Sequence, residues 1–193
     1  MKLKKAAMFG LDARIALAIF GALSVISGAA LYSAIQQAKV VAIVTELNEI
    51  SKAAESLMLD TGVELAVHAG DQLKLKYLLE DIDSVPGWNG PYISGYTAFA
   101  DNGLNHPQYT GVHILKFQKH LATGARTGCS SGLSCDIWVH ITGIPTELVK
   151  AVDEYVDGSY DLADGRVQGA DYSGSVAGTH TISYKAFPAL NQP

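Results

Sequence analysis

Residues 15–35 form an uninterrupted apolar run, IALAIFGALSVISGAALYSAI, that contains no charged side chain. A helix rises about 1.5 Å per residue, so roughly 20 apolar residues are enough to cross the hydrocarbon core of a bilayer. The run is also longer than the apolar region of a secretory signal peptide, which holds about 7–15 residues. The sequence therefore predicts a membrane-spanning helix over residues 11–36.

The helical pattern continues beyond this run, but in amphipathic form over residues 37–61. Apolar residues recur there mostly at three- to four-residue spacing, which is typical of a helix with one buried stripe. No proline interrupts residues 11–60, and Asp60-Thr61-Gly62 supplies a stop, with Gly62 suited to a left-handed cap. We expect one helix over residues 11–60. Its buried stripe would consist of Val40, Ile43, Val44, Leu47, Ile50, Leu57 and Met58.

Three lysines, Lys2, Lys4 and Lys5, precede the apolar run. By the positive-inside rule this end stays cytoplasmic, and the chain after about residue 36 emerges on the other side. One interpretation is an ordinary anchor that is never cut. The other is a basic leader of residues 1–10 that is removed after Gly10, which makes Leu11 the first mature residue.

A basic leader ending in Gly, followed by a long apolar and then amphipathic helix and a small head, resembles the type IV pilin superfamily, which includes type II secretion pseudopilins. The resemblance implies cleavage by a prepilin peptidase between Gly10 and Leu11, and methylation of the new N-terminus. It implies storage in the bacterial inner membrane with the head periplasmic, then assembly with copies of itself into an extracellular filament or a periplasmic pseudopilus. The family typically has Glu at the fifth mature position, where this chain has Ile15. Asp12 is the nearest acid, and with Arg14 it is the expected assembly charge.

The remaining residues, 62–193, predict a globular α+β head in which a small antiparallel sheet packs on the amphipathic half of the helix. Alternating apolar residues predict three strands, at 111–117, 135–141 and 181–187. A helix is expected at 145–155, with Pro145 in its first turn. Residues 65–79 have mixed helical character, and the Gly/Ser-rich residues 124–134 are expected to form a loop.

The string Gly87-Trp88-Asn89-Gly90-Pro91-Tyr92-Ile93 is the most distinctive motif of the head. Gly90 and Pro91 favour a turn, and Trp88 and Tyr92 can cover the exposed end of a helix or sheet. The stretch resembles the W-x-G-P-Y sequence that follows the first helix in many pilins and pseudopilins. We interpret it as a structural turn rather than a binding site, because buried aromatic residues mostly serve packing.

The two cysteines, Cys129 and Cys135, lie on either side of a Gly/Ser-rich loop. The predicted topology places them in an oxidising compartment, where an even number of cysteines indicates a disulfide. No histidine has the ligand spacing that a zinc site with these cysteines would need.

The acidic residues 152–166 allow two interpretations. Asp157, Ser159 and Asp161 have the first three spacings of a Ca²⁺ loop, and Asp164 is a further oxygen donor. Leu162 stands where an EF-hand loop needs Gly, however, and the closing Glu is absent as well. Asp-Gly pairs are also good turn formers, so we favour a solvated turn. Some members of the resembled family bind Ca²⁺ in C-terminal loops, so Ca²⁺ remains the alternative, and no other cofactor is expected.

Composition and motifs exclude other classes of function. The net charge is −5, so the chain lacks the basic footprint of a nucleic-acid-binding protein. It contains no G-x-S-x-G, H-E-x-x-H or P-loop sequence, and its six histidines are dispersed and read as surface or strand residues. We expect a structural subunit of a type IV pilus or pilus-like filament rather than an enzyme. The alternatives are a type II secretion pseudopilin and a single-pass membrane-anchored binding domain.

Overall fold

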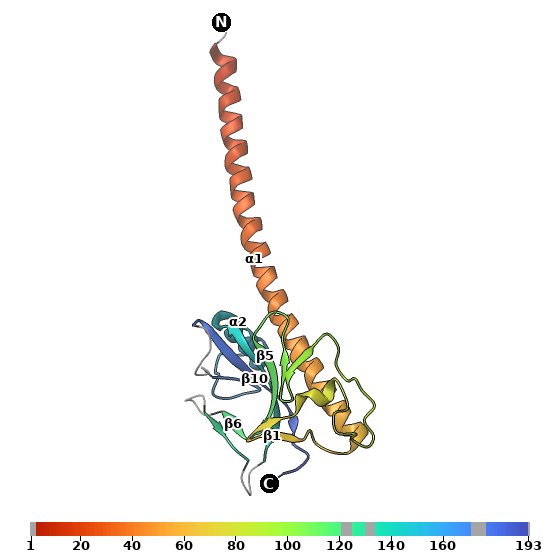
Figure 1. The fold of residues 1–193 in the computed structure, drawn as a ribbon. Helices are drawn as coiled ribbons and strands as arrows, with labels where there is room; N and C mark the ends of the chain where they lie inside the picture. Colours follow the sequence, from red (N-terminus) through yellow and green to blue (C-terminus); the bar gives the residue numbers. More distant parts are fainter. Residues whose placement is uncertain (1–2, 121–124, 130–133, 171–176, 193) are drawn as a thin grey trace. The chain divides into compact units, whose positions relative to one another are not determined.

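A computed structural model describes residues 3–120, 125–129, 134–170 and 177–192 of the chain. The chain divides into two compact units, Met1–Lys39 and Val40–Pro193. Helix α1 (Leu3–Thr61) supplies residues to both units (Figure 1). With the antiparallel sheet of the second unit, this helix confirms the predicted α+β fold.

Helix α1 ends where the sequence predicts but begins earlier. Gly62 adopts a left-handed φ of 69°. Its N–H donates to the carbonyl oxygen of Met58 at 2.9 Å, which is the expected glycine cap. The helix starts at Leu3 rather than at residue 11. The leader residues Leu, Lys, Ala and Met are all good helix formers, so nothing in them stops the helix before it reaches the apolar run.

The second unit is built on an eight-stranded antiparallel sheet whose main path runs β1-β2-β5-β8-β10-β9, with β4 also paired to β5 and β3 to β4. Two further short strands, β6 and β7, pair with each other. The strands are β1 (Val67–Ala69), β2 (Gln72–Leu73), β3 (Thr97–Ala100), β4 (Gly103–Asn105), β5 (Gly111–Phe117), β6 (Lys119–His120), β7 (Arg126–Thr127), β8 (Asp136–Pro145), β9 (Val167–Ala170) and β10 (Thr179–Pro188).

The three predicted strands are confirmed, but the sheet is larger than expected. Strand β5 has the predicted bounds, whereas β8 and β10 each extend further. The prediction of helical character over residues 65–79 is wrong for most of that stretch. It contains β1, β2 and only one 3₁₀ turn, η1 (Leu75–Leu78), because its leucines are buried without a sustained helical period. The expected loop 124–134 falls partly outside the described residues, and its described part contains the short strand β7.

The second half of α1 packs on one face of the sheet, beside β5, β8 and β10 (Figure 1). The predicted apolar stripe is buried, except that Val44 and Met58 are half-buried. Between Ile50 and Leu57 the stripe is completed by Ala53 and Ala54, which are also buried. The sheet residues that meet this helix alternate along their strands, as the period of two requires. They include Val112, Ile114, Val139, Ile141 and Ile182.

The opposite face of the sheet carries a second, smaller core. Leu115, Phe117 and Trp138 are buried there as a separate cluster. The rings of Phe117 and Trp138 stack with a centroid distance of 4.7 Å. Strands β5 and β8 therefore bury both of their faces.

Helix α2 (Thr146–Asp157) connects β8 to β9. It begins directly after Pro145 and ends at Gly158, whose φ is 80°. The prediction of a helix at 145–155 is confirmed to within two residues at its end. Its buried side is formed by Leu148, Val149, Val152 and Asp153.

Candidate functional regions

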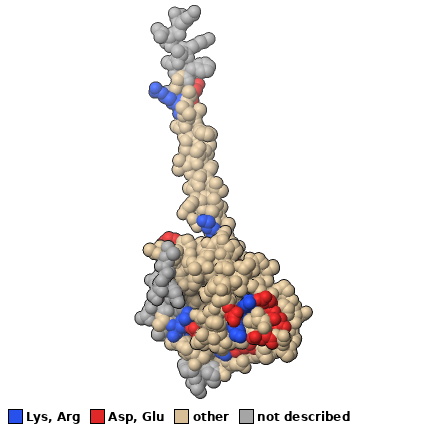
Figure 2. Space-filling view, viewed as in Figure 1, with Lys and Arg blue, Asp and Glu red and all other residues tan. Residues whose placement is uncertain are grey.

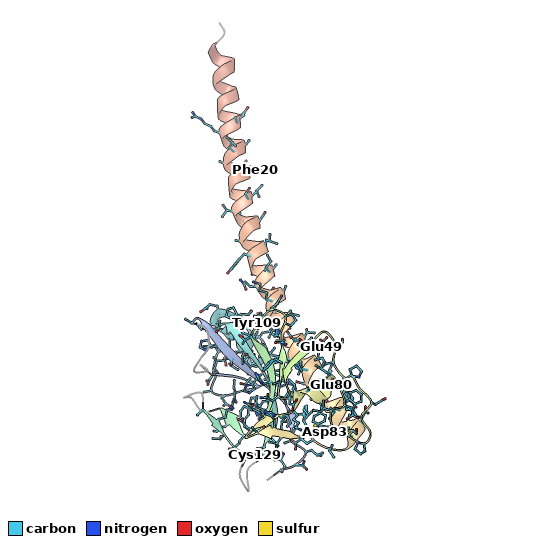
Figure 3. The ribbon with its side chains drawn as sticks, viewed as in Figure 1. Phe20, Glu49, Glu80, Asp83, Tyr109 and Cys129 are labelled. Atoms are coloured by element: carbon cyan, nitrogen blue, oxygen red, sulfur yellow. A yellow bond between two sulfur atoms is a disulfide. The ribbon has the colours of Figure 1, made fainter. Side chains whose placement is uncertain are left out.

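The first unit offers an apolar helical surface that is exposed in the part of the chain that the structure describes. Every side chain from Asp12 to residue 35 is exposed. Asp12–Thr61 is the one described segment long and apolar enough to cross a membrane by length and composition, with a mean hydropathy of 2.1. Figure 2 shows a continuous uncharged band along this part of the helix, and Figure 3 shows Phe20 pointing away from it. The segment is therefore a candidate membrane anchor.

The residues expected at the start of the mature chain lie on this helix. Gly10, Asp12 and Arg14 are all exposed, whereas the side chain of Leu11 lies outside the described residues. Asp12 and Arg14 are two residues apart, and successive helical residues turn by about 100°, so their side chains leave opposite sides of the helix. The two charges cannot pair within one chain.

The aromatic turn packs against the C-terminal end of α1. The indole Nε1 of Trp88 donates to the carbonyl oxygen of Tyr77 at 2.8 Å. The Tyr92 hydroxyl donates to Asp60 Oδ2 at 3.0 Å and accepts from the N–H of Asn89 at 2.9 Å. The rings of Trp88 and Tyr92 meet edge to face at 5.8 Å. This geometry is that of a structural turn that covers a helix end.

The glycines of this turn are required by close approach. A Cβ on Gly87 would lie 2.4 Å from the carbonyl oxygen of Asp60, and the residue has a φ of 84°. A Cβ on Gly90 would lie 2.6 Å from the Trp88 ring. The peptide bond between Gly90 and Pro91 is cis.

The predicted disulfide between Cys129 and Cys135 is present. Residues of the C-terminal segment bind the backbone of Cys135. The carbonyl oxygen of Gln192's side chain accepts from the Cys135 N–H at 2.7 Å, and its Nε2 donates to the Cys135 carbonyl at 3.1 Å. The disulfide therefore sits where the chain enters β8.

A buried ion pair lies nearby. Lys116 Nζ donates to Glu64 Oε2 at 2.9 Å, and their side chains are 17% and 5% exposed. The N–H of Asn191 donates to the same carboxylate oxygen at 3.2 Å. The other oxygen of Glu64 is buried and has no donor among the described residues. The pair joins the segment that follows α1, strand β5 and the C-terminal segment.

The acidic loop after α2 uses its carboxylates to hold its own backbone. Asp157 Oδ2 accepts from the N–H groups of Arg166 and Val167 at 3.0 and 2.8 Å. Asp161 Oδ1 accepts from Ala163, and Asp164 Oδ1 from Gly165. Ser159 is exposed. Within the described residues no group of three or more His, Cys, Asp or Glu side chains is placed to hold a metal ion. Ca²⁺ stays the alternative to the solvated turn.

Sequence reasoning missed the buried carboxyl of Asp153, which sits at the base of this loop. Asp153 is fully buried, and its Oδ2 accepts from the N–H of Asp161 at 2.7 Å. Its Oδ1 has no donor within the described residues. Burial first, and then the neighbouring carboxylate of Asp157, raises the pKa of Asp153 to about 6. The i, i+4 spacing of the two acids on α2 was the available signal.

The histidines were expected on the surface or in strands, and His106 is an exception. His113 and His140 face each other across β5 and β8, as strand residues. Burial lowers the pKa of His113. His106 follows β4 in a loop, yet its side chain is only 3% exposed. Glu46 of α1 and the backbone N–H groups of Gln108 and Tyr109 surround its ring. No local sequence pattern predicts such an environment.

No protein-family model, curated protein sequence or solved structure matches the chain at a significant level. Its class therefore rests on the structure, which is an α+β head with a long N-terminal helix that includes a candidate membrane anchor. This architecture is compatible with a pilin-like fold.

Proposed function

We propose that the chain is a structural subunit of a type IV pilus or pilus-like filament, stored in the inner membrane before assembly. The observation that carries the proposal is helix α1. Its first part is apolar on every side and bare, and its second part forms the core of the head. The basic leader ending in Gly10, the aromatic turn and the disulfide agree with it.

The physical mechanism is the exchange of lipid for protein around the apolar helix. In the bilayer, the side chains between Asp12 and residue 35 contact acyl chains. In a filament, the same side chains would contact the helices of neighbouring copies, with little change in polarity and a gain in van der Waals packing. Contacts between different surfaces of identical subunits produce an open filament when the rotation from one copy to the next does not close into a ring. A prepilin peptidase and an assembly machinery would act on the chain before this step.

The charges of Asp12 and Arg14 would set the stagger between copies. An unpaired charge inside an apolar bundle is costly, and these two side chains cannot reach each other within one helix. Asp12 of one copy would therefore pair with Arg14, or with the free N-terminal amine, of the next. This arrangement would take the place of the family's Glu at the position that Ile15 occupies.

The decisive experiment combines intact mass with electron microscopy of sheared cell-surface material. We expect a mature mass that begins at Leu11 and fibres that contain the protein. Gly10→Val should leave the leader in place and abolish fibres, whereas Ala6→Val, a leader change away from the junction, should alter neither. A mature protein that retains Met1 and forms no fibres would reject the proposal in favour of an anchored binding domain. Fibres confined to the periplasm would instead assign a pseudopilin.

The pairing of charges has its own test. Asp12→Asn and Arg14→Gln should each reduce fibre number, because each leaves the partner charge unpaired. The exchange Asp12→Arg with Arg14→Asp should restore fibres at least in part. Fibres unaffected by both single changes would contradict the role of these charges while leaving filament assembly intact.

A further inference from the structure

A buried polar cluster joins the second half of α1 to the segment that leads from β4 to β5. Glu46 comes from α1, and Tyr96, His106 and Tyr109 come from the segment around β3 and β4. His106 Nε2 lies 2.8 Å from Glu46 Oε1, and the Tyr96 hydroxyl donates to the same oxygen. The rings of His106 and Tyr109, the latter labelled in Figure 3, lie 4.6 Å apart.

The hydrogen bonds of His106 fix which of its ring nitrogens carries the proton. Nδ1 accepts from the N–H of Gln108 and from the N–H of Tyr109, each at 2.9 Å. A nitrogen that accepts hydrogen bonds carries no proton, so in the neutral ring the proton is on Nε2, facing Glu46. In the neutral ring Nδ1 therefore accepts hydrogen bonds and Nε2 carries the proton, 2.8 Å from Glu46 Oε1 but without hydrogen-bond geometry among the described residues.

This geometry is the one that Asn and Asp side chains adopt when they bind the N–H groups two and three residues ahead in a turn. Pro107 has no N–H, so Gln108 and Tyr109 supply the first two N–H donors after His106. An Asn in this place would accept the same hydrogen bonds at every pH. A histidine accepts them only while it is neutral, and histidine changes its charge between roughly pH 5 and 8.

The groups that face His106 set the response to acid. Glu46 on α1 lies 2.8 Å from Nε2, where it would attract a positive imidazole. Burial raises the pKa of both Tyr96 and Tyr109, so these hydroxyls stay neutral. A protonated Nδ1 needs a hydrogen-bond acceptor, but it faces the N–H groups of Gln108 and Tyr109, which are donors. The ring is only 3% exposed. A proton on Nδ1 is therefore incompatible with the hydrogen bonds from Gln108 and Tyr109.

We propose that His106 is a proton-operated latch that holds the turn 106–109 against α1 when neutral and releases it when protonated. The released turn would uncover Glu46 and the hydroxyl of Tyr96. The latch depends on contacts inside the second unit, so it does not rest on filament assembly and would operate equally in an anchored binding domain.

Amide hydrogen exchange of the full-length protein in a mild detergent tests the latch. After correction for intrinsic rates, protection of the Gln108 and Tyr109 amides should fall about 10- to 30-fold between pH 7.5 and pH 5, the effect of losing two hydrogen bonds. Protection of the β8–β10 ladder should not change. His106→Asn keeps the acceptor and cannot be protonated, so its turn should stay protected at both values. His106→Gln keeps a donor for Glu46 but loses the nearby acceptor, so its turn should be unprotected at both.

Two results would overturn the proposal. One is equal protection of these amides at pH 5 and 7.5 in the unaltered protein. The other is the same acid-induced loss in His106→Asn as in the unaltered protein. If a variant does not fold, the ring nitrogens of His106 in the unaltered protein provide the answer by NMR. Protonation of Nδ1 must then coincide with the loss of protection, and protonation without that loss refutes the latch.

Discussion

Replacing Asp153 by Asn should stabilise the head at neutral pH. Asp153 is fully buried on α2, with Oδ2 bonded to the N–H of Asp161 and Oδ1 without a donor among the described residues. An Asn side chain can keep the first bond through its carbonyl oxygen. Its amide can donate towards the carboxylate of Asp157, which the ionised Asp cannot do.

The magnitude follows from the pKa of Asp153, which burial raises from 3.8 to about 6. Between these two values the folded protein binds more protons than the unfolded protein, so stability falls as pH rises through this window. A pKa that is about two pH units higher in the folded state corresponds to roughly 3 kcal/mol lost by pH 7. Asp153→Asn should recover up to about 3 kcal/mol at pH 7 and little at pH 4.

Urea unfolding of the full-length protein in detergent, followed by tryptophan fluorescence at pH 4, 5.5 and 7, measures this difference. Both reporters, Trp88 and Trp138, lie in the Val40–Pro193 unit. Asp164→Asn is the matched control, because Asp164 is exposed and should change stability by less than about 0.5 kcal/mol. If Asp153→Asn has the same pH dependence as the unaltered protein, burial does not oppose the charge and the argument fails.

Three further outcomes are expected from the same unfolding assay. Removing the disulfide by changing Cys129 and Cys135 to Ser should cost about 2 kcal/mol, since the closed loop is short; no change would contradict the entropic account. Trp88→Phe should cost about 1 kcal/mol for the lost indole hydrogen bond, and Trp88→Ala roughly 3–5 kcal/mol for the lost packing. Equal losses in the two variants would show that packing and the hydrogen bond do not contribute in these proportions. Lys116→Met should cost roughly 3–5 kcal/mol because it leaves the Glu64 carboxylate buried and unpaired. The additional change Glu64→Leu should recover most of that loss, and failure to recover would show that the charge is not its source.

The elements with a strong periodic signal could be predicted from the sequence. Helix α1 has an apolar run and then a stripe with a period near 3.6, and Gly62 marks its end. Strand β5 is a mostly apolar run interrupted only by His113 and Lys116. Strands β2 and β9 could not be predicted, because they are too short to show a periodic pattern and pair with β5 and β10. Their conformation is decided by a neighbouring strand rather than by their own residues.

The candidate sites also differ in whether the sequence alone could predict them. The bond between Cys129 and Cys135 was predictable from the even number of cysteines and from the compartment that the sequence predicts. The surroundings of His106 and of Asp153 arise from contacts between elements distant in the chain or packed by the fold. Glu46 and His106 are 60 residues apart, so no local pattern could join them.

The second half of α1 covers one face of the sheet, and this packing determines where a water-soluble fragment can begin. The chain changes from apolar run to head near residue 36, but the sheet residues Val112, Ile114 and Val139 are covered by helix residues that begin at Val40. A fragment cut at residue 62, after the helix, would present those strands bare and should aggregate. A fragment that begins at Val40 keeps the helix residues that cover the sheet. It is shorter than the full-length chain and is the version to crystallise.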